Sequence, residues 1–381
     1  MKRLSLCLMT VLMALALSGC NPLGKDNNIP PSPLMKFKQT VSVQRLWTAS
    51  VGNGDGGYYL RLVPAAANNT VFAVSHNGNV MAYAANTGRL RWGTSLRQSI
   101  TSGVVAGDGN VYVGTGAARL VALSQKTGKI MWSRTLTGEV LAQPQYAKGI
   151  VLVHTVAGTL AAFSADDGHR LWRFDQHVPS LILHAAGQPQ VAGNYAVAGF
   201  ANGQLSALGL TTGRVVWDQH ITIPMGDNPV ARMVDITVNP VIVDGVVYVT
   251  TYQGRVAALN LGDGRMIWQH KLSSYAGMTA DRSRLYIADA KSELWAFNEA
   301  SGAVAWRQTR LRGRQITAPV IYKNMLVTAD RYGYLHFMSL SDGHFLARVS
   351  MGRGALAAPV SYRGNLYIYT SAGKLLAVRG R

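Results

Sequence analysis

The stretch SQKTGKIMW, residues 124–132, is one of seven related nine-residue stretches in this chain. Six of them end in Trp and place a Gly four residues before it, whereas the seventh, SLSDGHFLA, ends in Ala347. The other five are AANTGRLRW (84–92), SADDGHRLW (164–172), GLTTGRVVW (209–217), NLGDGRMIW (260–268) and NEASGAVAW (298–306). Self-similarity at a fixed period is the sequence sign of a repeat architecture.

A second series of glycines, each about ten residues before the Gly of the nine-residue stretch, gives the number of repeats. It comprises Gly78, Gly116, Gly158, Gly203, Gly254 and Gly333, with Ser292 in the sixth place and one further member, Gly373. The chain therefore holds eight copies, and the spacing between turn glycines is 38 to 51 residues. Each copy contains four short runs rich in Val, Leu and Tyr, separated by Gly-containing turns. This predicts an all-β fold, an eight-bladed β-propeller with four antiparallel strands per blade.

The repeated tryptophans are interpreted as structural residues. A Trp at the same place in each blade faces the seam to the next blade, where it buries a large area and needs a partner for its N–H. The eighth copy lacks an outer strand, and VQRLWTA, residues 43–49, supplies a candidate together with the missing Trp. We therefore expect an N-terminal strand to close the ring. The structural set is Trp47, Trp92, Trp132, Trp172, Trp217, Trp268 and Trp306.

The N-terminus has the pattern of an export signal. Basic MKR precedes the apolar run 4–17, which is too short to span a bilayer comfortably. The run ends in LSGC, residues 17–20, which resembles the bacterial lipobox. That resemblance implies cleavage after residue 19 and lipidation, including palmitate, of Cys20. Asn21 follows, which by resemblance to enterobacterial sorting favours the outer membrane. Residues 20–42 contain four prolines and are expected to form a tether, and residues 43–381 the propeller.

Composition limits the classes of function. The chain has 381 residues and a formal charge of +19, and loss of Lys2 and Arg3 with the signal leaves +17. An exported protein with no basic helix and no run of five cations does not fit a nucleic-acid binder. The charge fits either a solvated surface with scattered Arg or attraction to an anionic partner or lipid. Only Cys7 and Cys20 exist, so the mature chain is expected to have no disulfide.

Motifs for chemistry are missing from the sequence. The nine His residues are scattered singly, and neither a metal-binding His pattern nor a Gly-x-Ser-x-Gly elbow occurs. The Gly-xxx-Trp repeat resembles the tryptophan-docking repeat of quinoprotein alcohol dehydrogenases, which bind pyrroloquinoline quinone. Those enzymes typically use a vicinal Cys pair and Ca²⁺ held by carboxylates, and residues 43–381 contain no Cys. We therefore expect no catalytic residue, no metal and no cofactor.

The lipobox, the tether and the eight-copy repeat together resemble the BamB family, the lipoprotein subunits of the outer-membrane β-barrel assembly machinery. The resemblance covers the full chain. It implies a non-enzymatic scaffold on the periplasmic side of the outer membrane that binds the POTRA domains of BamA and assists insertion of β-barrel proteins. It also implies possible contact with nascent outer-membrane proteins.

Two adjacent connections break the repeat spacing. The distance from a Trp to the next marker is 24 to 27 residues in four blades, but 31 after Trp172 and 37 after Trp217. The enlarged segments include HVPSLILHAAGQ (177–188) and PMGDNPVARMVDITVNP (224–240). Insertions on one face of a propeller often bind partners. From the residues alone, the apolar side chains of the first segment either fold back or face a partner.

The family resemblance adds specific residues to these two segments. Members of the family contact BamA through a Leu-x-Leu-Arg stretch and a nearby Asp-x-Asp pair. Leu181 and Leu183 match the leucines and Asp235 the first Asp, whereas His184 replaces the Arg and Thr237 the second Asp. Two other functions stay open at this point: a periplasmic quinoprotein-like dehydrogenase, and a module that binds an anionic envelope polymer.

Overall fold

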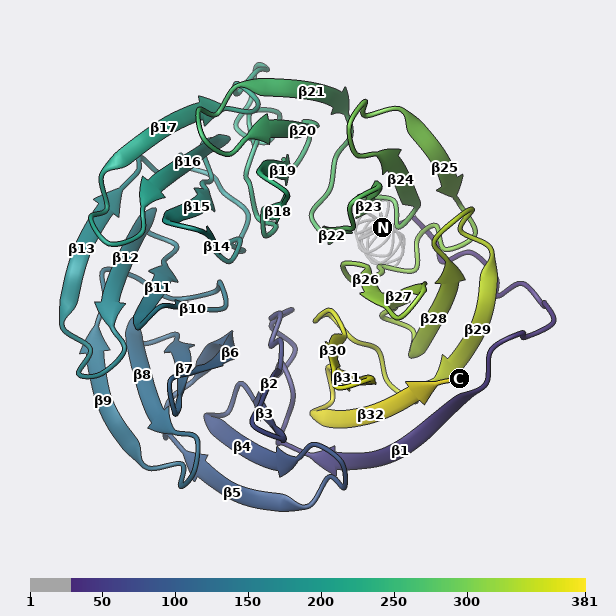
Figure 1. Ribbon diagram of the computed structural model, residues 1–381, viewed down its shortest axis with the longest axis horizontal. Helices are drawn as coiled ribbons and strands as arrows, with labels where there is room; N and C mark the ends of the chain where they lie inside the picture. Colours follow the sequence, from purple (N-terminus) through teal and green to yellow (C-terminus); the bar gives the residue numbers. More distant parts are fainter. Residues whose placement is uncertain (1–28) are drawn as a thin grey trace, which may run out of the picture. The chain divides into compact units, whose positions relative to one another are not determined.

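The computed structural model describes residues 29–381 and confirms the predicted eight-bladed propeller. The predicted signal peptide and Cys20 lie outside the described residues. Residues 31–381 form one compact unit of eight four-stranded antiparallel sheets. Figure 1 shows the sheets arranged as blades around a ring. No helix in residues 29–381 is long and apolar enough to cross a membrane.

Seven blades are built from four consecutive strands each, in sequence order from the innermost to the outermost. Blades 1 to 4 are β2 (Ala65–Ala67), β3 (Thr70–Val74), β4 (Asn79–Ala84) and β5 (Leu90–Ser95); β6 (Ile100–Gly107), β7 (Asn110–Thr115), β8 (Arg119–Ser124) and β9 (Ile130–Thr135); β10 (Gln145–Ala147), β11 (Ile150–His154), β12 (Thr159–Ser164) and β13 (Arg170–Asp175); β14 (Gln190–Ala192), β15 (Tyr195–Gly199), β16 (Gln204–Gly209) and β17 (Val215–His220). Blades 5 to 7 are β18 (Val241–Val243), β19 (Val246–Thr250), β20 (Arg255–Asn260) and β21 (Met266–Lys271); β22 (Gly277–Ala280), β23 (Arg284–Ala288), β24 (Leu294–Asn298) and β25 (Val304–Gln308); β26 (Val320–Tyr322), β27 (Met325–Ala329), β28 (Tyr334–Ser339) and β29 (Phe345–Ser350).

Blade 8 joins the two ends of the chain, as the sequence predicts. Its inner strands are β30 (Val360–Tyr362), β31 (Asn365–Tyr369) and β32 (Lys374–Gly380), and its outer strand is β1 (Val43–Ser50). The register pairs Trp47 with Ala377 and shifts between Arg45 and Trp47. The same shift beside the Trp occurs in the other blades that carry one, for example between Ala82 and Tyr83 opposite Trp92. Strand β1 is therefore a full equivalent of the other outer strands.

The direction of the strands divides the connections between two faces. The long connections from one blade to the next and the turns between second and third strands emerge on one face, here called the loop face. His76 N, in such a turn, donates to the carbonyl of Gly54 in a blade-to-blade connection, at 2.8 Å. The turns between third and fourth strands, which carry the repeated Gly, emerge on the opposite face, here called the turn face.

The seven repeat tryptophans occupy the seams between blades. Each indole N–H donates to a main-chain carbonyl of the next blade, at 2.7 to 3.1 Å, from Trp47 to Ala85, Trp92 to Gln125, Trp132 to Ala165, Trp172 to Leu210, Trp217 to Leu261, Trp268 to Glu299 and Trp306 to Leu340. The turn Gly of that next blade lies directly over the indole ring. A Cβ at Gly213, for example, would lie 2.6 Å from the Trp172 ring.

This geometry explains why Ala347 breaks the repeat. The indole of each blade is covered by the turn between the third and fourth strands of the next blade. Blade 8 has no such turn, because its third strand is β32 and its fourth strand is β1, which come from opposite chain ends. The seam beside buried Ala347 is instead packed by Val41, just before β1, and by Val43, the first residue of β1.

The turn glycines give a prediction with a matched control. Gly213 has φ +66° and no room for a Cβ, whereas Gly245 has φ +81° and no atom within 4 Å of a Cβ. Substitution by Ala strains the backbone at both positions, but only Gly213→Ala also forces the Trp172 ring to move. Overpacking typically costs about 1–3 kcal/mol. We expect Gly213→Ala to lower the thermal unfolding midpoint by several degrees more than Gly245→Ala, and equal shifts would contradict this packing.

Residues 31–42 contact the propeller and are called the N-terminal strap. Ser32 N donates to the carbonyl of Arg312 at 2.9 Å, Phe37 stacks on Phe345 with ring centroids 5.4 Å apart, and Thr40 N donates to the carbonyl of Leu346 at 2.9 Å. In Figure 1 the strap runs along the outside of blade 7. This differs from the tether predicted over residues 20–42, because Phe37 and Val41, which follow the last proline of the segment, pack against the propeller.

Candidate partner-binding loops

Two enlarged connections lie next to each other on the loop face. The first long loop (residues 176–189) joins β13 to β14, and the second long loop (residues 221–240) joins β17 to β18. The loops are tied together by hydrogen bonds: Leu183 N donates to Asp235 Oδ1 at 2.9 Å, and Gln188 N donates to Asn239 Oδ1 at 2.8 Å. The two interruptions of the repeat thus form one continuous surface.

The apolar stretch of the first long loop is divided between surface and interior. Leu181 is 40% exposed, whereas Ile182 and Leu183 are half-buried. Ile182 faces a small pocket that Val156 and Val178 also line. Of the two predicted leucines, Leu181 is therefore the one that presents its side chain outward. Leu183 contributes mainly through its backbone N–H and holds the loop against the second one.

His184, at the position of the family's Arg, lies on the surface beside an acid. Its Nε2 is 3.2 Å from Glu139 Oε2, and the imidazole is exposed. Glu139 belongs to the connection between β9 and β10, one blade away. His184 can therefore donate a hydrogen bond at the rim of the loop surface, next to Leu181.

Asp235 and Thr237, which the family resemblance places in the contact with a partner, lie beneath the loop surface in this structure. Only 1% of Asp235 and 2% of Thr237 are exposed, because residues 233–238 turn inward. The Ile236 side chain fills the space over Gly199. The Thr237 carbonyl accepts from Arg61 Nη1 at 3.1 Å. In this arrangement Asp235 and Thr237 position the loops from below.

Burial also shifts the pKa of Asp235. Desolvation raises the pKa of this carboxyl above its ordinary value, while the Leu183 N–H opposes the rise. A raised pKa in the folded state means that the group favours folding most at low pH, and that this contribution falls as pH rises through the folded pKa.

We expect Asp235→Asn to keep the acceptor for Leu183 N and to remove the buried charge. At neutral pH the variant should be at least as stable as the wild type, and its unfolding midpoint should vary less with pH across the acid range. Thermal melts at several pH values measure this. A midpoint that drops sharply at neutral pH would contradict the assigned role.

The most exposed apolar side chains of the two loops were not among the residues predicted from the sequence. Ile223, Met225 and Val230, at the tip of the second long loop, are 68%, 76% and 59% exposed. The signal available in the sequence is a set of apolar residues in an irregular segment that contains Pro and Gly. These three side chains give the second long loop exposed apolar area of its own.

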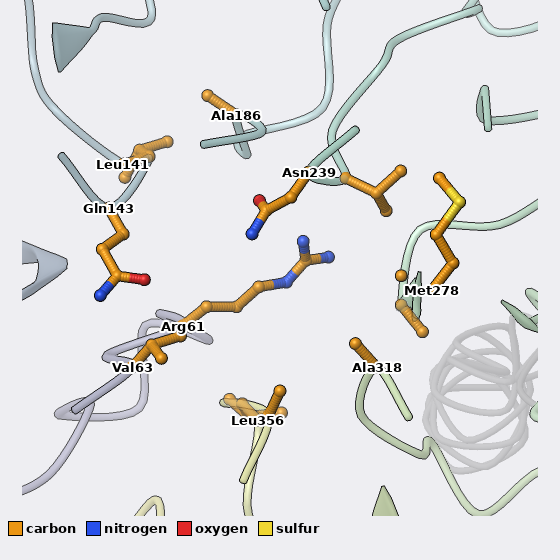
Figure 2. A pocket seen from close by; sticks show the side chains of 13 residues that line it. Arg61, Val63, Leu141, Gln143, Ala186, Asn239, Met278, Ala318 and Leu356 are labelled. Carbon is orange, nitrogen blue, oxygen red and sulfur yellow. The ribbon is translucent and has the colours of Figure 1, made fainter. Parts of the chain in front are cut away.

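A pocket on the ring axis is the place where a catalytic centre of the dehydrogenase kind would be expected. It measures about 90 Å³, and its lining includes Arg61, Gln143 and Asn239 but no carboxylate and no Cys. Figure 2 shows Arg61 reaching into this pocket toward Asn239. Within residues 29–381, no three His, Cys, Asp or Glu side chains are grouped so that they could hold a metal ion. This lining does not fit the calcium-bound quinone of the dehydrogenases.

Comparison with known proteins assigns the chain to a family. The family model described as "Outer membrane protein assembly factor BamB" matches residues 42–102 and 76–308. The protein of that name from Legionella pneumophila is 44% identical over 93% of this chain and 92% of its own length. The one from Pseudomonas aeruginosa is 43% identical over 96% of both chains. This chain belongs to the BamB family.

Solved structures agree on the fold. The crystal structure of BamB from Moraxella catarrhalis matches with a TM-score of 0.82 at 24% identity, covering 89% of this chain and all of that one. A quinohemoprotein alcohol dehydrogenase from Comamonas testosteroni matches with a TM-score of 0.71 at 14% identity, covering 88% of this chain and 76% of its own. The BamB family thus shares its ring of blades with enzymes, and the fold alone does not distinguish the two functions.

Proposed function

We propose that the protein is a non-enzymatic scaffold in the assembly of outer-membrane proteins. The observation that carries the proposal is its similarity, over more than nine-tenths of its length, to relatives named as outer membrane protein assembly factors. The LSGC sequence supports a lipid on Cys20 and attachment to the outer membrane, with the propeller in the periplasm.

The two long loops are the proposed binding surface for the POTRA domains of BamA. Leu181 from the first loop and Ile223, Met225 and Val230 from the second supply exposed apolar side chains, and the exposed His184 can donate a hydrogen bond to a partner. Apolar side chains surrounded by polar ones are typical of a protein interface. Asp235 and Thr237 are assigned to positioning these loops. Leu183 is assigned a smaller share of the partner contact than Leu181, because its side chain is half-buried.

Depletion of the chain in its native cells tests the proposed role. The amount of folded barrel protein in the outer membrane should fall and should return when the wild-type chain is supplied. A Cys20→Ala chain, which cannot carry the lipid, should restore it less well. Unchanged barrel-protein levels upon depletion would reject the role.

The enzyme alternative gives a different outcome. A dehydrogenase would take up pyrroloquinoline quinone with Ca²⁺ and change the absorption spectrum of the quinone. The lining of the axial pocket supplies neither the carboxylates nor the Cys pair that such a centre uses, so we expect no spectral change. Stoichiometric uptake of the quinone would favour the enzyme.

A further inference from the structure

The loop face carries a second surface, separated from the long loops by the ring axis. It combines three tyrosines and three arginines from blades 7, 8 and 1 and the connection leading to blade 7. We call the set Tyr58, Tyr59, Arg310, Arg331, Tyr332 and Arg353 the basic crescent. Tyr58, Tyr59 and Tyr332 are among the exposed large side chains of the protein, and Arg310 and Arg353 are exposed.

The crescent is held in place by contacts among its own members and with the blades below. The Arg331 guanidinium lies over the Tyr59 ring, 4.2 Å from its centroid, and Arg331 Nη2 donates to Tyr59 Oη at 2.6 Å. Tyr58 packs on His76, with ring centroids 4.4 Å apart. The loop that carries both tyrosines is fixed to blade 8, where Asp55 N donates to the carbonyl of Ser371 at 3.2 Å.

The charge of the crescent is not compensated at the surface. The acids of the neighbouring segments, Asp55, Glu293 and Asp330, are all buried. Asp330 accepts from Arg314 Nε at 2.6 Å and faces His336 Nε2 at 3.0 Å. By contrast, in the part of the chain that the structure describes, Arg310, Arg331 and Arg353 have no carboxylate within 4.0 Å.

The N-terminal strap links this surface to the predicted lipid. The strap leaves the propeller at Ser32, whose N–H and carbonyl bond to Arg312 and Arg314 in the connection that also carries Arg310. Ser32 lies twelve residues after Cys20, and at roughly 3.3–3.6 Å per residue this segment reaches at most about 40 Å. A lipid on Cys20 would therefore keep the crescent close to the membrane surface.

We propose that the basic crescent binds the anionic phospholipid headgroups of the membrane in which the protein is anchored. Arginine forms paired hydrogen bonds with phosphate oxygens, and tyrosine favours the boundary between headgroups and acyl chains. The long loops, across the ring axis, stay free for a protein partner. This inference rests on the lipid anchor of the proposed function, but not on the assignment of the partner.

Vesicle binding by the chain from residue 20 onward, with Cys20→Ala and hence no lipid, tests the crescent itself. The probe is phosphatidylcholine vesicles with and without phosphatidylglycerol. Each cation near an anionic surface strengthens binding by roughly fivefold. The protein should therefore bind the anionic vesicles in a salt-sensitive way. Arg310→Glu/Arg331→Glu/Arg353→Glu should weaken this binding by at least about tenfold.

The matched control is Arg89→Glu/Arg214→Glu/Arg265→Glu, which makes the same charge change at exposed positions of the turn face. It should retain most of the binding. Equal losses in the two triple variants, or no wild-type binding to anionic vesicles, would overturn the proposal. If Arg331→Glu impairs folding, Arg310→Glu/Arg353→Glu replaces the triple variant. Tyr58→Ser/Tyr332→Ser, which keeps the charge, should also weaken binding.

Two further outcomes separate this inference from the proposed function. Leu181→Asp/Met225→Asp should bind the vesicles like the wild type, because the long loops do not take part. A crescent variant that binds vesicles normally but loses a protein partner would assign the crescent to an acidic protein surface and overturn the lipid proposal.

Discussion

Removal of residues 43–50 is expected to prevent stable folding of the propeller. These residues form β1, which pairs with β32 over seven residue pairs from Val43 to Ser50. Their loss exposes the edge of β32 and removes the Trp47 indole, which lies under Gly88 and donates to Ala85 O. The Trp alone contributes about 3–5 kcal/mol. With the lost strand hydrogen bonds, the total approaches the whole net stability of about 5–15 kcal/mol.

Thermal melting and size-exclusion chromatography measure this effect. The truncated chain should aggregate or melt far below the wild type, since an open strand edge promotes association. Trp47→Ala, which keeps the strand and loses only the indole, should give a folded monomer with an intermediate melting temperature. A truncated monomer that melts with the wild type would show that β1 does not close the ring.

Replacement of Leu181 and Met225 by Asp is expected to weaken binding of the protein partner strongly. Leu181 is 40% exposed and Met225 is 76% exposed, so both have apolar area left to bury in a complex. Burial of that area is worth roughly 1–2 kcal/mol for each side chain, and a desolvated Asp adds a further cost. The dissociation constant should rise by about 10²–10³-fold.

The control for this change is Ile130→Asp/Met131→Asp, on the outer strand β9. These two side chains are also exposed and apolar, but they lie away from the long loops. Both double variants should melt within about a degree or two of the wild type, because surface substitutions usually cost under about 0.5 kcal/mol. Undiminished partner binding by Leu181→Asp/Met225→Asp would reject the interface, as would equal loss in the control.

The ring could be predicted from the sequence because each blade repeats the same local signals. The glycines marked every copy, and the missing outer strand of the eighth copy pointed to residues 43–49. The replacement of the Trp by Ala347 could not be explained in the same way. Its reason is the lack of a turn where the two chain ends meet, and that appears only when the indoles are seen under the turns of the next blade.

The candidate site was predicted less completely than the fold. Spacing located the two long loops, and Leu181 is exposed there. Asp235 and Thr237 came from the family resemblance, which does not distinguish exposed from buried residues, and residues 233–238 turn inward. Similarly, the proline content of residues 20–42 favoured a tether throughout, whereas Phe37 and Val41 pack against blades 7 and 8.

A photo-crosslinking amino acid at position 181 tests the central claim most directly. In intact cells, with the same group at position 130 on the outer strand as the control, the adducts from position 181 are isolated and identified by mass spectrometry. The account predicts one dominant adduct from position 181, with a POTRA-containing subunit of the assembly machinery, and little of it from position 130. A dominant adduct from position 130 with none from position 181 would contradict the account.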